Sequence, residues 1–216
     1  MAIYLDYNEW KSGVASWLDT TSGPVFENTG VYIALAEQEL DRVMTLRQSM
    51  RFATNVIDND GILTLPDDFT KMKSVITPVS DVSLEAVTID QYQTMRARSN
   101  AADGQPLYYC IIGEKVQFIP LGTGYEVQIA YYRKAVPLST TVPENIYTKY
   151  APEALLAAAV MYGFKFAADE ERMALWAQQY ESLVDKLNKD AQRGELGSSP
   201  LKMRSASRMP THRRGI

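Results

Sequence analysis

Four aspartates in one short stretch have the clearest capacity for chemistry: Asp58, Asp60, Asp67 and Asp68. Paired carboxylates can hydrolyse glycosides or hold a metal ion. A calcium loop of the EF-hand type needs glycine at its sixth position and glutamate at its twelfth, but counting from Asp58 the glycine is fourth and the twelfth residue is Phe69. Asp-Gly and Pro-Asp are ordinary turn sequences, so the spacing favours turns over a metal or catalytic site.

Other groups that could support catalysis are single and far apart. Nucleophilic catalysis by serine or cysteine needs an imidazole in hydrogen-bond reach, and the only histidine, His212, lies near the end of the chain. The single cysteine, Cys110, excludes an intramolecular disulfide and a multi-cysteine zinc site. Neither a P-loop nor a G-x-S-x-G pattern is present. We expect no enzymatic activity, no metal and no cofactor. The alternative is a cell-wall-degrading enzyme that uses these aspartates for catalysis.

Two patterns could bind nucleotides or bases. Gly122 and Gly124 could belong to a dinucleotide loop, but no helix follows and a third glycine is missing, so we expect a hairpin turn. The Tyr-Tyr pairs at 108–109 and 131–132 could stack on bases. Tyrosine is a common strand residue and no basic residue interleaves the first pair, so half-buried strand packing is favoured.

Charge is divided unevenly along the chain. The formal net charge is −4, yet residues 193–216 hold six basic side chains and one acid, so this tail carries about +5 and the rest about −9. Such a tail can stay solvated or bind nucleic acid, an acidic membrane or a protein. Interleaved apolar residues favour a protein partner, because electrostatic binding of nucleic acid needs no such anchors. The expected partner-binding residues are Leu196, Leu201, Lys202, Met203, Arg204, Arg208, Met209, Arg213, Arg214 and Ile216.

Two segments with helical periodicity precede residue 52. Residues 8–18 carry one apolar face, formed by Trp10, Val14, Trp17 and Leu18. A second helix, capped at 28 or 29, runs to residue 47. Its predicted stripe is Ile33, Ala36, Leu40, Val43 and Met44, opposite Glu37, Asp41 and Arg42.

Alternation then replaces the helical period, which predicts antiparallel strands over 52–139. A hairpin turn is expected at 58–61, a turn that closes the following strand at 65–69, and turns between three later strands at 113–114 and 121–124. Residues 82–98 are compatible with a short helix. The region is expected to be a compact meander or a small sandwich.

The helical pattern returns at Pro152, which suits a first helical turn. Residues 154–164 are apolar nearly all round, which predicts a central buried helix, although the run is about half of what a bilayer span needs. No export signal is recognised either, so we expect neither export nor membrane insertion. A fourth helix is predicted from Asp169 to near Gly194, with a core-packing stripe of Met173, Trp176, Ala177, Tyr180, Leu183, Val184 and Leu187.

The predicted fold class is α+β: an antiparallel bundle of about four helices, interrupted by a small antiparallel β-domain insertion and followed by an extended C-terminal arm. The predicted parts are 1–51 for the first two helices, 52–139 for the β insertion, 140–193 for the last two helices and 194–216 for the arm.

Four stretches occur in a characteristic order. YIALAEQELDR at 32–42 is followed by LPDDF at 65–69. Residues 104–139 contain a Gly-x-Pro-x-x-Tyr strand, a Pro-terminated strand and a Tyr-Tyr strand, and 150–187 hold two helices joined by an Asp-Glu turn. Together they resemble the head-to-tail adaptor, or connector, proteins of short-tailed phages.

The resemblance implies a structural virion protein at the head-tail junction, assembled in the host cytoplasm and without a membrane partner. Copies would form a ring, expected to contain twelve, under the portal protein. The ring would surround the channel through which phage DNA passes without sequence-specific binding. The C-terminal arms would dock on the portal, and a downstream tail or nozzle protein would bind below.

Overall fold

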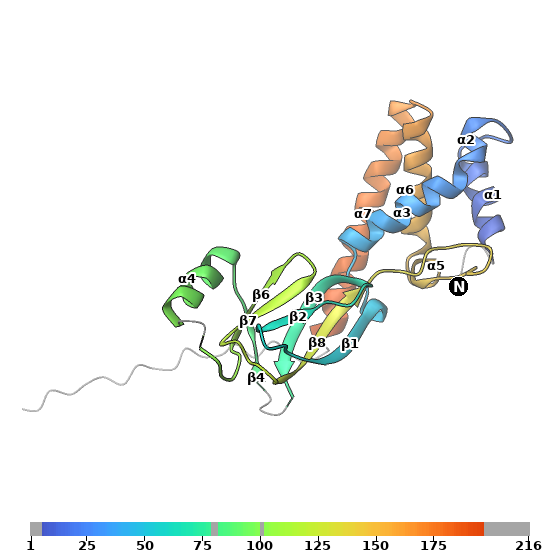
Figure 1. Ribbon diagram of the computed structural model, residues 1–216. Helices are drawn as coiled ribbons and strands as arrows, with labels where there is room; N and C mark the ends of the chain where they lie inside the picture. The colour runs from blue at the N-terminus through green and yellow to red at the C-terminus, as the bar shows by residue number, and fades with distance from the viewer. Residues whose placement is uncertain (1–5, 79–81, 100–101, 197–216) are drawn as a thin grey trace, which may run out of the picture.

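The computed structural model describes residues 6–78, 82–99 and 102–196 (Figure 1). These residues form α-helices and two four-stranded β-sheets, so the predicted α+β class is confirmed. The helices are α1 (Tyr7–Trp17), α2 (Pro24–Glu27), α3 (Thr29–Val43), α4 (Ile89–Ser99), α5 (Ile146–Tyr150), α6 (Pro152–Phe166) and α7 (Glu170–Leu196). The strands are β1 (Met50–Val56), β2 (Ile62–Thr64), β3 (Phe69–Thr77), β4 (Val82–Ser83), β5 (Glu85–Ala86), β6 (Tyr108–Ile112), β7 (Lys115–Ile119) and β8 (Glu126–Arg133).

Helix starts follow local capping chemistry. The Asp6 carboxylate accepts hydrogen bonds from the backbone N–H groups of Asn8 (2.7 Å) and Glu9 (2.8 Å) and so caps α1. Pro152 occupies the first turn of α6, as predicted. The expected side-chain cap of α3 is wrong, because the short helix α2 directly precedes α3 and the Asn28 side chain donates back to the Pro24 carbonyl at 2.7 Å.

One apolar core joins α1, α3, α6 and α7, which we call the helical part together with α2 and α5. Helix α6 is buried over most of its length, which confirms its predicted central position. Gly163 lets α1 approach α6 closely, since a Cβ there would collide with the Leu18 side chain. Trp17, predicted to lie on the apolar face of residues 8–18, is 52% exposed and contacts Trp176 edge to face, with ring centroids 5.3 Å apart.

The two sheets form the β part. Their strand orders are β1-β8-β3-β4 and β2-β7-β6-β5. Apolar residues from both sheets share one buried cluster, including Val75, Phe118, Val127 and Ile129. The β part is therefore a small sandwich rather than a meander.

Several predicted connections differ from those found. Residues 113–114 do form a hairpin between β6 and β7. The hairpin predictions at 58–61 and 121–124 are wrong, because these turns carry the chain from one sheet to the other: β1 pairs with β8, and β2 pairs with β7. The expectation of purely antiparallel pairing is also wrong, since β5 and β6 are parallel and α4 lies in the crossover that parallel neighbours require.

Candidate assembly interface

A connecting segment, residues 134–145, links the β part to the helical part and is anchored on α3 by two carboxylates. The Ala135 backbone N–H donates to Asp41 Oδ1 at 2.9 Å, and the Leu138 N–H donates to Glu37 Oε1 at 3.0 Å. The Tyr147 hydroxyl donates to Asp41 Oδ1 at 2.7 Å. Both carboxylates therefore satisfy backbone groups of a segment that has no sheet or helix partner of its own.

Asn145 completes this anchor. Its amide nitrogen donates to Glu37 and, at 3.1 Å, to the Val136 carbonyl. Its side-chain oxygen accepts from the backbone N–H groups of Tyr147 (2.9 Å) and Thr148 (3.1 Å), and the Thr148 hydroxyl accepts from the Asn145 N–H, which forms a capping box at α5. One buried side chain thus fixes both the connection and the start of α5.

Burial changes the titration of this cluster. It raises the pKa of Glu37 to about 7, against the opposing hydrogen bonds from Leu138 and Asn145, and the nearby charge of Asp41 adds to the rise. Burial also raises the pKa of Asp41, while its hydrogen bonds from Tyr147 and Ala135 oppose the rise. Glu37 is therefore a group that changes charge near neutral pH inside a structural contact.

Glu37 and Asp41 were predicted to lie opposite the apolar stripe of this helix, and that prediction is wrong. Glu37 is only 5% exposed, and Asp41 is half-buried. The spacing did indicate burial. Glu37 lies four residues after Ile33, and Asp41 lies four residues after Glu37, so all three share one face of the helix. Their acidic type suggested solvent instead, although an acid can be buried where backbone donors meet it.

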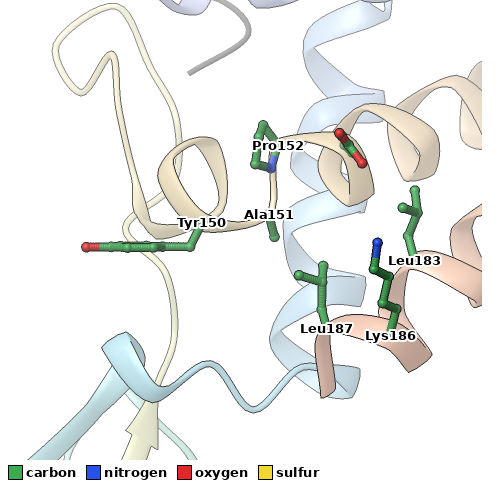
Figure 2. A pocket seen from close by; sticks show the side chains of 7 residues that line it. Tyr150, Ala151, Pro152, Leu183, Lys186 and Leu187 are labelled. Carbon is green, nitrogen blue, oxygen red and sulfur yellow. The ribbon is translucent and has the colours of Figure 1, made fainter. Parts of the chain in front are cut away.

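Two hollows lie beside the second half of α7. The first, of about 230 Å³, lies between the α5–α6 junction at Tyr150–Glu153 and α7, which contributes Leu183, Lys186 and Leu187 (Figure 2). Tyr150 is 48% exposed and points away from α7. The second hollow, of about 290 Å³, lies between the α3–β1 connection and residues 187–191. Both are within a few turns of the end of α7.

A third hollow, of about 370 Å³, is lined by residues of β1, β8, the connecting segment and α5. Its charged lining residues are Arg51, Arg133, Lys149 and Glu144, and Lys149 pairs with Glu144 at 2.8 Å. Neither arginine forms an ion pair with any other described residue. Val136 and Tyr150 add exposed apolar surface. We call this site the basic hollow.

A model of the SU10 adaptor protein family matches residues 6–204 of the chain. The chain belongs to this family. The match confirms the resemblance to phage head-to-tail adaptors and makes the chain a structural phage adaptor protein of the virion. Among curated proteins, no match is found. None of the helices in the described part of the adaptor is long and apolar enough to span a membrane.

The aspartates of the adaptor shape turns, as predicted. The Asp58 carboxylate accepts hydrogen bonds from the backbone N–H groups of Asp60 (3.0 Å) and Ile62 (2.7 Å), and Gly61 adopts a φ of +73° in the same turn. Asp68 accepts a hydrogen bond from the Tyr131 hydroxyl at 2.9 Å. Across the described ranges, no three acids, histidines or cysteines gather in a group that could hold a metal ion.

Two packing predictions for the adaptor are confirmed. Tyr109, Tyr131 and Tyr132 are buried on their strands, and Tyr108 is half-buried. The predicted stripe of α7 faces the helical core, with Tyr180 buried and its apolar neighbours partly buried against the cluster. The tyrosine pairs therefore pack on their strands, and the α7 stripe packs on the helical core.

The predicted partner-binding residues stand at the end of α7 or beyond it. Leu196 is the last residue of the helix, which continues two residues past the predicted end at Gly194. The other nine residues, 201–216, and the Leu196 side chain lie outside the described residues. Their role remains a prediction.

Proposed function

We propose that this adaptor forms a ring of twelve copies under the portal protein, connects capsid to tail and surrounds the DNA channel without enzymatic activity. The observation that supports this most strongly is the family match, whose bounds, residues 6 and 204, enclose both sheets and α7. The adaptor family thus includes the first residues of the arm as well as the folded part.

Each predicted part has a place in this proposal. Residues 1–51 and 140–193 form the packed body of the ring, and 52–139 contact adjacent copies or the next tail or nozzle protein. Residues 194–216 form the arm that binds the portal. The net charge of about −9 outside the tail suits a channel wall that repels DNA and lets it slide.

Helix α7 supports the arm proposal. Its 27 residues make a rod of about 40 Å that starts in the helical core, passes the hollows near Tyr150 and ends at Leu196, where the arm continues the chain. An extended chain of the remaining 20 residues could span at most about 70 Å, enough to cross a neighbouring subunit. The basic residues supply charge, and Leu201, Met203, Met209 and Ile216 supply apolar anchors.

Binding to purified portal rings tests the proposal. The full chain should bind, and a chain that ends at Leu196, which keeps α7 whole, should lose binding. A second variant separates apolar from charged contacts: it changes Leu201, Met203, Met209 and Ile216 to serine and keeps every basic residue. We expect this variant to bind at least tenfold more weakly. If the shortened chain joins the portal as tightly as the full chain, the arm proposal is wrong.

The same proteins test the two alternatives. A nucleic-acid-binding tail predicts DNA affinity that falls steeply with salt and is unchanged by the serine variant. A wall-degrading enzyme predicts peptidoglycan hydrolysis that is lost in Asp67→Ala and Asp68→Ala. Under the adaptor proposal, DNA affinity is weak and hydrolysis is absent in every variant.

A further inference from the structure

β1 is the longest of the strands that end the two sheets in the described part of the chain. The two sheets end in β1, β4, β2 and β5. The last three have only two or three residues, whereas β1 has seven and pairs only with β8 (Figure 1). An edge strand directs alternate N–H and C=O groups away from its sheet, and short edges limit pairing with other chains. β1 is thus the one terminal strand of more than three residues in the described sheets, although β3 is also uncovered over most of one side, because β4 pairs only with Ile76 and Thr77.

The side chains of β1 do not protect this edge. Phe52 is 63% exposed and Val56 is 62% exposed, and both lie on the same face of the strand because they are four residues apart. Proline and lysine are common means of blocking an edge, and the sequence of β1, MRFATNV, has neither. Its one charged residue, Arg51, lies on the opposite face from Phe52 and Val56 and lines the basic hollow. An exposed apolar edge of this length is typical of a binding strand.

The basic hollow lies at the beginning of this strand. Gln48 and Arg51 line it from the β1 side, and Arg133 lines it from the end of β8, where Met50 pairs with Tyr132. The hollow is lined by two arginines that have no ion pair with any described residue, by Lys149 and by one acid, Glu144, in a molecule whose net charge is −4. A segment that follows the edge of β1 would therefore reach a concentration of positive charge at one end.

The positive charge of the basic hollow indicates which kind of segment could bind along β1. The C-terminal arm of this chain carries a net charge of about +4 and would be repelled by the hollow, so it is not the occupant. A row of backbone donors and acceptors fits another peptide backbone better than a phosphate backbone, and Val136 and Tyr150 offer apolar contact at the hollow. A peptide with carboxylates near its end meets both requirements.

We infer that an extended acidic segment of a partner protein adds to β1 as a further strand and places its carboxylates in the basic hollow, against Arg51 and Arg133. This contact is separate from the arm and independent of it, so the adaptor holds two partners through different chemistry: a basic arm for one and a β1 edge for the other.

A peptide-binding experiment tests this inference. The probe is the fluorescent peptide Glu-Glu-Thr-Val-Thr-Val-Thr-Glu-Glu, with acids at both ends because strand direction is free. It is titrated against the full chain and against the chain that ends at Leu196, which removes any attraction to the basic arm. We expect both to bind it and to show slowed amide hydrogen exchange at 50–56. Binding that leaves exchange in β1 unchanged overturns the inference.

Matched variants identify the chemistry. The double variant Arg51→Glu, Arg133→Glu should bind the acidic probe at least tenfold more weakly and should prefer the same peptide with lysine ends. The double variant Arg51→Gln, Arg133→Gln should bind the acidic probe with intermediate affinity. A peptide with proline in place of valine should not bind, because proline cannot pair with a strand edge. Equal affinity for acidic and basic peptides overturns the inference, as does displacement of the probe by short duplex DNA. Portal binding through the arm is measured separately, so either proposal can fail alone.

Discussion

The helical part and the β part of this adaptor bury their surfaces in different ways. The helical core includes a polar anchor, in which Glu37 and Asp41 hold the connecting segment, whereas the cluster between the sheets is made of apolar residues and tyrosines. Both parts leave some large apolar side chains in solvent, Phe166 and Leu175 among the helices and Phe52 and Val56 on β1, but only β1 combines them with a seven-residue strand that ends its sheet. The difference teaches that the helical part uses buried polar groups to hold its own connections, whereas the β part leaves a strand edge that the proposed partner segment would cover.

The largest expected effect comes from emptying one core at a time. Phe118→Ala in the β part should cost about 4 kcal/mol and Leu155→Ala in α6 about 3 kcal/mol, because both side chains are fully buried. Since the two cores are separate clusters, each change should lower the melting temperature of its own part most. All three tryptophans lie in the helical part and report its unfolding, and hydrogen exchange in β7 and β8 reports the other.

The exposed residue Leu175 in α7 supplies the control, and Leu175→Ala should change stability by less than about 0.5 kcal/mol. Coincident loss of both signals in Phe118→Ala and Leu155→Ala would show that the two cores unfold as one unit.

A smaller effect is expected from the polar anchor, whose titration makes the stability of the helical part depend on pH. The folded-state pKa of Glu37, about 7, exceeds the ordinary value of 4.5, so between these pH values the folded protein keeps a proton that the unfolded chain releases. The free energy of unfolding of the helical part should therefore fall as pH rises from 5 to 7, by at most about 3 kcal/mol from this group. Denaturant unfolding followed by tryptophan fluorescence measures this slope.

Glu37→Gln keeps an oxygen acceptor for Leu138 and removes the titration, so its profile should be flatter than that of the native chain over this range. The burial of Asp41 raises its pKa too and adds a slope of the same sign, so Asp41→Asn should flatten the profile further. Parallel profiles for the native chain and Glu37→Gln would contradict the assignment.

The smallest effect distinguishes the turns of the β part. Gly61→Ala should cost about 2 kcal/mol, because Gly61 has a positive φ and a Cβ would lie 2.7 Å from Leu121 Cδ2 and 3.1 Å from its Cα. Gly113 has a similar φ of +62° but open space around it, so Gly113→Ala should cost about 1 kcal/mol from backbone strain alone. Urea unfolding measures both losses of stability. If the two variants lose the same free energy of unfolding, the turn at Gly61, which connects the two sheets, is no tighter than the hairpin at Gly113.

The sequence by itself determined the class of the fold, the four main helices, most strand segments and the turn chemistry of the aspartates. These features depend on neighbours a few residues apart: the three- and four-residue steps of α6 and α7, and the Asp-Gly pair that closes the turn before β2. The family resemblance was likewise carried by short stretches in order, and it is confirmed.

Only the tertiary structure decided which strands pair, where Glu37 lies and what β1 exposes. The turns at 58–61 and 121–124 have the residues of hairpins, yet the partners of β1 and β2 come from strands more than 50 residues later, which no local pattern records. Glu37 is buried because Leu138 and Asn145, about a hundred residues away, bring donors to it. The open edge of β1 likewise exists because no described segment covers it, and that depends on the path of the whole chain.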